Sequence, residues 1–260
     1  MNIKKADLIV FAGQSNMSGR GTKEEAVKCP AGAGFEYKPV SRPDTLVPIE
    51  EPFGLNEERE DGLYDRLYSE RSGSMVSAAV AEYYRRTGRQ VVALAASMGG
   101  TSTRQWLEDG LLTDALDRLK QTFAFLDSQG IAVERKYLVW CQGETDADFK
   151  VPAEEYIART ENILGQFVEH GIEKCFLVQI GHYNYVDCPE ARGGMTGEEL
   201  DRCYGVIRNA QFQICLDKGD VVLAASFEPY LHEMKDAFHY RQSAYNEVGL
   251  HVGRKMARSR

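Results

Sequence analysis

The chain alternates short, almost continuously apolar runs with longer segments in which hydrophobic residues recur every three or four positions. The short runs are typical of strands that are buried on both faces of a parallel sheet. The longer segments have the period of amphipathic helices. The pattern predicts strands at 8–12, 91–97, 137–142, 175–180 and 221–226, and helices at 74–87, 111–129, 153–169, 197–217 and 241–257.

The predicted strands and helices follow one another in alternation, which favours a parallel sheet with helices on both faces. We therefore expect an α/β fold, a three-layer α/β/α doubly wound sheet of about five parallel strands joined by right-handed crossovers. The 260 residues, of which 43% are hydrophobic, suffice to bury a sizeable core. Because the chain has no internal repeat and no low-complexity linker, residues 1–260 are expected to form a single domain.

Two segments are too long for the short connections that are typical of such folds, namely 19–72 and 182–196. Both follow a predicted strand, and in open parallel sheets the ligand crevice lies beyond the carboxyl ends of the strands. We expect both loops to lie near that crevice. For the first loop, the alternative is an ordered surface excursion that does not contact the substrate.

The net charge is −8, and the Lys and Arg residues are spread along the chain. This charge would repel a phosphate backbone, so we do not expect nucleic acid as a partner. Small neutral substrates are expected instead. No apolar run approaches the roughly 20 residues needed to span a bilayer. The amino terminus leads almost directly into a strand without the apolar region of a signal peptide. We therefore expect no membrane association and a cytoplasmic location.

The six cysteines lie far apart, without a CxxC pair and without a histidine at metal-ligand spacing. We interpret most of them as reduced packing residues and expect no metal. A catalytic thiol would need a neighbouring base in an electropositive setting. Only Cys141 lies beside a motif of interest, and there a buried strand position is the preferred interpretation.

The first predicted strand ends in the sequence GQSNM, which places the hydroxyl of Ser15 at the carboxyl edge of the sheet. A serine hydroxyl is a poor nucleophile unless a base removes its proton, so this interpretation requires a histidine within reach. The motif is not the full G-x-S-x-G elbow, because Met17 replaces the second glycine. A serine that merely caps a turn is the alternative.

Asp236 and His239 lie three residues apart, just before the last predicted helix. This spacing lets one short loop turn both side chains to the same point, where the carboxylate can hold the imidazole in the tautomer that accepts a proton from Ser15. The alternative for this pair is an N-cap aspartate next to a surface histidine.

Two further predicted strands end in residues that can donate hydrogen bonds. Gly99 and Gly100 follow the second strand, where backbone without side chains can bring an N–H close to an oxyanion. Gln142 ends the third strand in QGETD and carries an amide donor. Either segment alone can be an ordinary turn, but three consecutive strands carry such residues at one edge of the sheet.

Taken together, the four motifs resemble those of a known group of proteins. The segments GQSNMSGRG, GGTSTRQW, QGETD and DAFH occur in order between residues 13 and 239. This combination resembles the SGNH hydrolase superfamily, whose sheet is flavodoxin-like. It is most similar to the carbohydrate esterase branch that includes acetylxylan esterases and sialate O-acetylesterase-like proteins.

The resemblance implies a role for each matching residue. Ser15 is then the nucleophile, His239 the general base and later the general acid, and Asp236 its orienting partner. The backbone N–H groups of Ser15 and Gly100, with the side chain of Gln142, are implied to form the oxyanion hole. Where this chain has Gln142, the superfamily usually has an asparagine. The carbohydrate esterase branch has a glutamine there, as this chain does.

Four other residues are candidates for supporting roles. Glu144 and Asn16 are expected to support the site through hydrogen bonds. His182 follows the fourth predicted strand and is either a contact at the crevice rim or an ordinary polar loop residue. Trp106 is either a stacking platform for a sugar or a core aromatic residue.

These observations favour a serine esterase that hydrolyses O-acetyl or other short acyl esters of carbohydrates through an acyl-enzyme intermediate, without a cofactor. Its partner is then a small-molecule or oligosaccharide acetyl ester; the particular sugar and the oligomeric state stay open. One alternative is a carbohydrate-binding relative without catalysis. Another is a flavodoxin-like phosphate or nucleotide binder that uses the loop 13–21. That loop, however, lacks the GK[ST] ending of a P-loop and the GxGxxG spacing.

Overall fold

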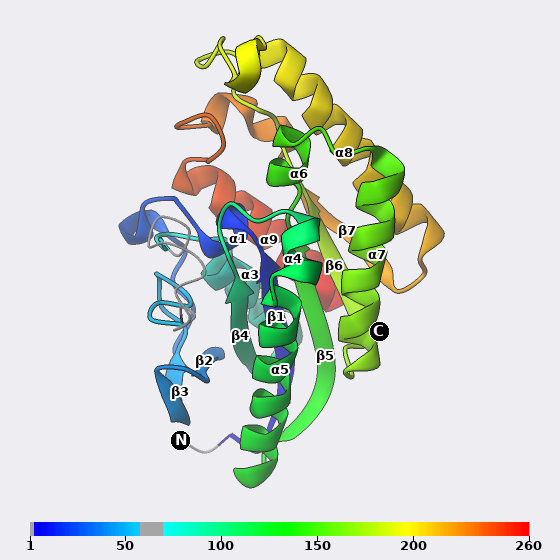
Figure 1. Cartoon of the computed structure of the whole chain (residues 1–260). Helices are drawn as coiled ribbons and strands as arrows, with labels where there is room; N and C mark the ends of the chain where they lie inside the picture. The colour runs from blue at the N-terminus through cyan, green and yellow to red at the C-terminus, as the bar shows by residue number, and fades with distance from the viewer. Residues whose placement is uncertain (1–2, 58–69, 260) are drawn as a thin grey trace.

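The computed structural model describes residues 3–57 and 70–259, and within these ranges it contains one sheet of seven strands (Figure 1). The strand order is β3-β2-β4-β1-β5-β6-β7. All neighbouring pairs are parallel except β2 and β3. The strands are β1 (Lys5–Gly13), β2 (Gly34–Lys38), β3 (Arg42–Pro48), β4 (Val91–Ser97), β5 (Ala132–Cys141), β6 (Lys174–Gln179) and β7 (Val221–Ser226).

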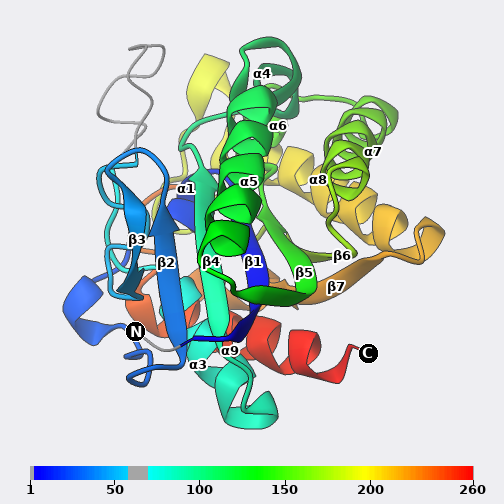
Figure 2. The ribbon, with the colours of Figure 1, turned by 90° about the horizontal axis from the view of Figure 1, so that it is seen from below.

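Helices cover both faces of this sheet, as Figure 2 shows with α3 and α9 on one side and α5 and α7 on the other. The α-helices are α1 (Ser15–Ser18), α3 (Val76–Thr87), α4 (Thr103–Glu108), α5 (Leu111–Ser128), α6 (Glu144–Asp148), α7 (Ala153–Glu169), α8 (Gly197–Asp217) and α9 (Gln242–Arg258). Short 3-10 turns are η1 (Lys23–Glu25), η2 (Arg192–Gly194) and η3 (Glu228–Glu233). The predicted three-layer α/β fold is confirmed.

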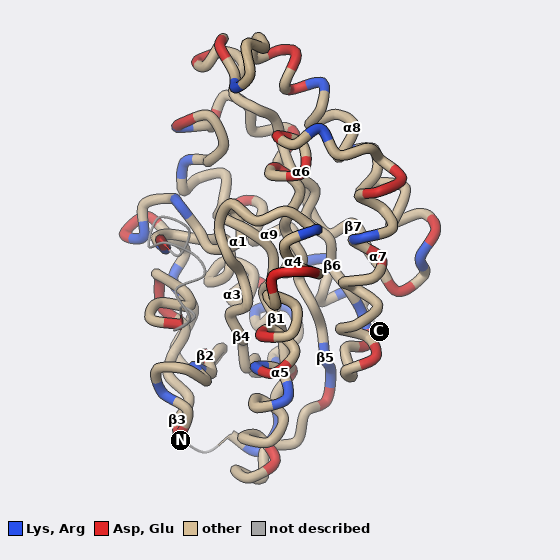
Figure 3. The backbone as a smooth tube through the Cα atoms, viewed as in Figure 1, with Lys and Arg blue, Asp and Glu red and all other residues tan. Residues whose placement is uncertain are grey.

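Charged residues of both signs are interspersed along the described backbone, as Figure 3 shows. Within residues 3–57 and 70–259, no helix combines the length and the apolar character that crossing a bilayer requires. In the same residues, no group of three or more His, Cys, Asp or Glu side chains is placed to hold a metal ion.

The alternation of side chains along β1 supplies both halves of the core. Leu8 and Val10 point into the layer that contains α5, α7 and α8, whereas Ile9 and Phe11 face α3 and α9. Because both sets are buried, the strand is apolar almost throughout, and this is what makes it recognisable in the sequence.

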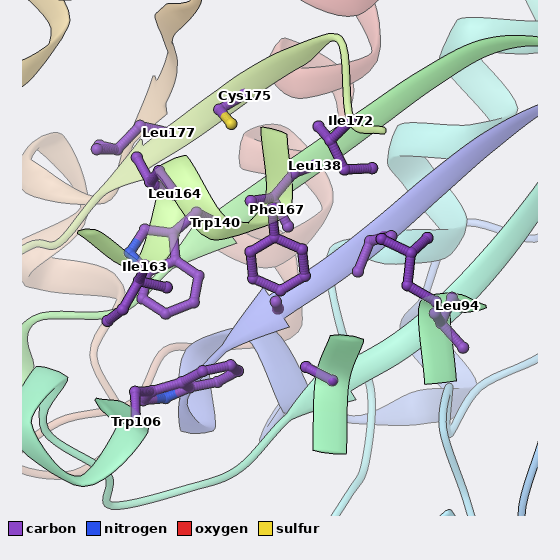
Figure 4. Packing of buried hydrophobic residues seen from close by; sticks show 14 of the residues in the cluster. Leu94, Trp106, Leu138, Trp140, Ile163, Leu164, Phe167, Ile172, Cys175 and Leu177 are labelled. Atoms are coloured by element: carbon purple, nitrogen blue, oxygen red, sulfur yellow. The ribbon is translucent and has the colours of Figure 1, made fainter. Parts of the chain in front are cut away.

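Trp106 lies in the first of these two core layers. It is 1% exposed, and its ring meets that of Trp140 edge to face at 4.8 Å between centroids (Figure 4). Of the two interpretations of Trp106, the core aromatic is therefore the one that the structure supports. Its indole N–H donates to Thr101 Oγ1 at 3.1 Å, so its polar group is satisfied inside the core.

The segment 19–72 contains more regular structure than the sequence predicts. It holds β2, which pairs parallel with β4, and β3, which forms an antiparallel edge. The sequence predicts about five parallel strands, whereas the sheet in the described residues contains six parallel strands and one antiparallel strand. Neither strand has an apolar run: β2 contains the polar Glu36, and the first four residues of β3 are exposed. Residues 58–69 of this segment lie outside the described residues.

The carboxyl ends of the three central strands lie side by side. Gly13 at the end of β1 pairs with Ser97 of β4 and with Cys141 of β5. Gly13 has a φ of +136°, and a Cβ atom there would lie 1.9 Å from the carbonyl oxygen of Cys141. Only glycine fits this close approach, and the chain leaves it directly into the short helix α1.

Candidate active site

Ser15 is the first residue of α1 and lies at the carboxyl edge of the sheet. The turn before it is fixed by two backbone hydrogen bonds, from Gln14 N to Cys141 O and from Met98 N to Gly13 O, both 2.9 Å. These bonds join the ends of β1, β4 and β5 beneath the serine. Ser15 lines a cavity of about 540 Å³.

His239 and Asp236 form a hydrogen-bonded row with Ser15. His239 Nε2 lies 3.0 Å from Ser15 Oγ, and Nδ1 lies 3.0 Å from the Asp236 carboxylate. The loop that carries both residues is closed by the hydrogen bond from Lys235 N to His239 O, at 2.9 Å. The fold thus brings together three side chains that the sequence predicts as partners, although Ser15 and His239 are 224 positions apart.

Asp236 is held in its ionised form by hydrogen-bond donors. Although partial burial opposes ionisation, hydrogen bonds from His239 and from the backbone N–H groups of Phe238 and His239 lower the pKa of Asp236 to about 2. Both backbone bonds reach Asp236 Oδ1 at 2.8 Å. A carboxylate fixed in this way can orient His239 and stabilise its protonated form.

The backbone N–H groups of Ser15 and Gly100 at the cavity are both available to an oxyanion. The N–H of Ser15 lies in the first turn of a helix, where no intrahelical acceptor exists. Among residues 3–57 and 70–259, no acceptor bonds the N–H of Ser15 or that of Gly100. Gly100 has a φ of +66°, a left-handed conformation that favours glycine, and both it and Gly99 line the cavity.

Gln142 is fully buried and joins the ends of the three central strands. Its Nε2 group lies 2.5 Å from Asp146 Oδ2, 3.0 Å from Thr101 O and 3.3 Å from Gln14 Oε1. An amide has only two hydrogens, so these acceptors already take up its donor capacity. In this arrangement Gln142 supports the loop that carries Gly100, and its side chain does not line the cavity.

Asn16 and Glu144 form a buried network beside Ser15. Asn16 Nδ2 donates to Glu144 Oε1 at 2.6 Å and to Phe238 O at 3.1 Å, and Tyr245 on α9 donates to Asn16 Oδ1 at 2.6 Å. Glu144 also lines the cavity, and burial raises its pKa. Both residues therefore lie where the sequence predicts supporting groups. Tyr245 was not predicted, since nothing distinguishes it from other helix aromatics in the sequence.

The cavity also contains residues from the two long loops. Arg20 and Ser72 come from the first loop and Arg192 from the second. Asp148 and Phe149 also line the cavity; they lie outside the four motifs, although they follow the QGETD segment by only a few positions.

His182 and the cysteines play no part in the cavity. His182 Nδ1 bonds the carboxylate of Asp201 at 2.9 Å, and the ring does not line the cavity. Cys141 is buried at the end of β5, and burial raises its pKa well above the ordinary value, which disfavours a thiolate. All six cysteines are free.

Comparison with known families places the chain among the carbohydrate esterases. Residues 5–258 match the family model described as carbohydrate esterase, sialic acid-specific acetylesterase. The chain belongs to this family, and the resemblance to carbohydrate esterases noted in the sequence is confirmed. Membership of this family supports the hydrolysis of acetyl esters on carbohydrates. It thereby supports the assignment of the protein to the carboxylic ester hydrolases.

Two solved structures share the fold. A protein from Arabidopsis thaliana is 17% identical with a TM-score of 0.66, and the match covers 96% of this chain and 97% of that one. A carbohydrate acetylesterase from Xanthomonas citri is 16% identical with a TM-score of 0.53, and the match covers 95% of this chain and 54% of that one. At these identities the likeness shows the fold alone. No curated protein matches the chain.

Proposed function

We propose that the protein is a serine esterase that removes O-acetyl groups, or other short acyl groups, from carbohydrates through an acyl-enzyme on Ser15. The observation that carries this proposal is the continuous row of hydrogen bonds from Asp236 through His239 to Ser15 Oγ at the wall of a cavity. Family membership supplies the class of substrate.

The chemistry needs only side chains and backbone of this chain. His239 Nε2 takes the proton of Ser15 Oγ as the oxygen attacks the acetyl carbonyl carbon. The N–H groups of Ser15 and Gly100 bind the oxygen that becomes negative in the tetrahedral intermediate. The intermediate collapses as His239 returns the proton to the departing sugar oxygen, which leaves acetyl-Ser15. Water, activated by His239, then releases acetate and restores the serine.

Gln142 is proposed as a third donor to the same oxygen, by family resemblance. Its contacts support an indirect contribution as well, because its bond to Thr101 O fixes the residue next to Gly100. To reach the oxyanion, the amide has to exchange one of its present acceptors for the substrate oxygen.

The two other functions have less support. A phosphate binder would leave the hydrogen-bonded pair of Asp236 and His239 without a role, and its loop 13–21 lacks the GK[ST] ending of a P-loop. A carbohydrate binder without catalysis would have no use for a histidine 3.0 Å from a serine hydroxyl. A cytoplasmic location and a small-molecule or oligosaccharide acetyl ester as partner, without nucleic acid or membrane, stay predictions from the sequence.

The decisive experiment measures acetate release from a panel of acetylated sugars and short aryl esters by the wild type and by Ser15→Ala. We expect Ser15→Ala to lower kcat on the order of 10⁴-fold or more, because the nucleophile is lost. A sulfonyl fluoride should label Ser15, as located by mass spectrometry, and the exposed Ser128→Ala variant should behave as wild type. Labelling of a cysteine together with full activity of Ser15→Ala would refute the proposal.

A further inference from the structure

One wall of the cavity consists of side chains that take no part in the proposed chemistry. Asp148 is the last residue of α6 and Phe149 follows it, and Arg192 lies in η2. Figure 1 shows the position of α6. We call these three residues the rim cluster. Phe149 is 62% exposed, which is unusual for a large aromatic side chain.

The backbone of the α6 turn fixes Phe149 in this exposed position. Phe149 N donates to Thr145 O at 3.1 Å, Lys150 N to Ala147 O at 2.9 Å and Val151 N to Asp146 O at 3.0 Å. Lys150 has a φ of +56°, a conformation that few residues other than glycine adopt. The turn is thus ordered by its own hydrogen bonds, whereas the ring that it presents remains largely uncovered.

The other two members of the rim cluster have unused polar atoms. Asp148 Oδ1 accepts a hydrogen bond from the buried Tyr204 hydroxyl at 3.0 Å, which orients the carboxylate. In the described part of the chain, no donor bonds Asp148 Oδ2, and no acceptor or carboxylate bonds the Arg192 guanidinium. A carboxylate acceptor and a guanidinium donor therefore line the same cavity as the exposed ring.

The rim cluster is linked to His239, the residue next to which the alcohol of the ester must leave. In the proposed reaction His239 protonates that oxygen, so the alcohol lies next to the imidazole. The Phe238 ring is 6.1 Å from the His239 ring, and the Arg192 guanidinium lies 5.9 Å above Phe238. The charge of Arg192 in turn acts on Asp148. Contacts through Phe238 thus lead from His239 to Arg192, and all three members of the rim cluster line the same cavity as His239.

We propose that the rim cluster binds the sugar ring of the ester, with the apolar face of a pyranose against Phe149 and its hydroxyls bonded to Asp148 and Arg192. A pyranose has C–H groups that pack on an aromatic ring and hydroxyls that both donate and accept. The carboxylate accepts from such hydroxyls and the guanidinium donates to them. This inference rests on the proposed function and extends it from the acetyl group to its alcohol.

The test compares two substrates, an acetylated methyl pyranoside and ethyl acetate, which has no ring. We expect Phe149→Ala to lower kcat/KM for the pyranoside by about tenfold, mainly through KM, because a stacking contact is lost. Ethyl acetate should be hydrolysed within about twofold of the wild-type rate. Phe149→Tyr should restore pyranoside activity, and Arg192→Gln should show a smaller loss that is confined to the pyranoside. Phe212→Ala, which removes an exposed ring on α8, should change neither substrate.

An equal loss on both substrates would show that Phe149 only supports the catalytic groups, and no loss on the pyranoside would exclude a sugar contact.

A binding measurement tests the sugar contact independently of the proposed catalytic activity. The acetylated pyranoside is titrated into Ser15→Ala and into Ser15→Ala/Phe149→Ala by calorimetry. We expect roughly tenfold weaker binding to the double variant even if wild type hydrolyses no ester. Equal binding by the two variants would overturn the inference.

Discussion

At the scale of single residues, the orientation of His239 depends on one carboxylate. Asp236 Oδ1 accepts two backbone N–H groups, and the carboxylate also accepts the hydrogen on His239 Nδ1. With that hydrogen on Nδ1, the lone pair of Nε2 faces Ser15 Oγ. The tautomer that can accept the serine proton is therefore selected by Asp236.

Asp236→Asn is expected to reduce kcat on the order of 10³- to 10⁴-fold. The amide keeps an oxygen for the two backbone donors, so the loop should stay folded, but its NH₂ group favours the tautomer with hydrogen on Nε2. Acetate release measures the loss, and the exposed Asp127→Asn is the control. Because the residues act as a unit, adding Asp236→Asn to His239→Ala should cost little more than His239→Ala alone.

A nearly unchanged Asp236→Asn enzyme would contradict this assignment. Glu144, a buried cavity residue that interacts electrostatically with His239, is then the candidate substitute. A further loss in the Asp236→Asn/Glu144→Gln double variant would identify it as the substitute.

Ser15 was predictable because it follows an apolar run, at the edge where a parallel sheet gathers its loops. Asp236 and His239 were predictable from their three-residue spacing just before the last helix. Ser15, His239 and Asp236 meet as the sequence indicates. The direction of the Gln142 amide was not predictable. It depends on Thr101 and on Asp146, and Asp146 in turn accepts hydrogen bonds from Thr103 on α4, 43 positions away in the sequence.

At the scale of secondary structure elements, local signals determined which boundaries were predictable. The predicted helix 197–217 coincides with α8, which begins after Thr196. Thr196 and Glu199 form a reciprocal capping box, a signal that lies in the sequence itself. β3 lacks such a signal, because an exposed edge strand needs neither an apolar run nor a cap. Its pairing with β2 is decided by tertiary contacts.

The packing of α9 against α3 depends on glycines that leave no room for a side chain. A Cβ atom on Gly249 would lie 2.3 Å from the carbonyl oxygen of Met75 and 2.8 Å from the Ala78 side chain. The same helix carries Tyr245, which donates to Asn16 beside the nucleophile. The distance between the two helices thus bears on the active site.

Two glycine-to-alanine changes should have opposite effects on stability. Gly249→Ala is expected to destabilise the protein by about 1–3 kcal/mol, because the added methyl group pushes α9 away from α3. Gly165→Ala in α7 meets no atom within 4 Å. It should stabilise by about 0.5–1 kcal/mol, since alanine loses less conformational entropy in a helix. Urea denaturation measures both, and a shift of the same sign in both variants would contradict the packing argument.

At the scale of the whole molecule, buried carboxyl groups of two kinds set how stability depends on pH. Burial raises the pKa of Glu36 on β2 to about 7, and it also raises those of Glu144, Asp146 and Asp148. In contrast, hydrogen bonds from Arg85 and Arg86 outweigh burial and lower the pKa of Glu82 to about 2.

The two kinds of carboxyl group change the stability of the fold in opposite pH ranges, one below and the other above about pH 4.5. A group with a lowered pKa contributes stability that is present above its unfolded pKa, near 4.5 for Glu82, and that is lost as the pH falls toward 2. A group with a raised pKa contributes stability that is complete below its unfolded pKa and is lost as the pH rises through its folded pKa. Stability should therefore be greatest near pH 4.5 and decline toward pH 8.

Glu36→Gln is expected to remove much of this decline. Glu36 is 3% exposed, and a shift of its pKa from 4.5 to about 7 corresponds to about 3 kcal/mol that wild type loses between these pH values. Glutamine keeps an oxygen to accept the N–H of Gly54, now 2.9 Å from Glu36 Oε1. Urea unfolding of wild type, Glu36→Gln and the exposed Glu154→Gln at pH 5 and pH 8 measures the effect. The three proteins should be similar at pH 5, and Glu36→Gln alone should be more stable at pH 8. A wild-type stability that rises from pH 5 to pH 8 would show that Glu36 is ionised at little cost, with Lys38 or Arg71 compensating its burial.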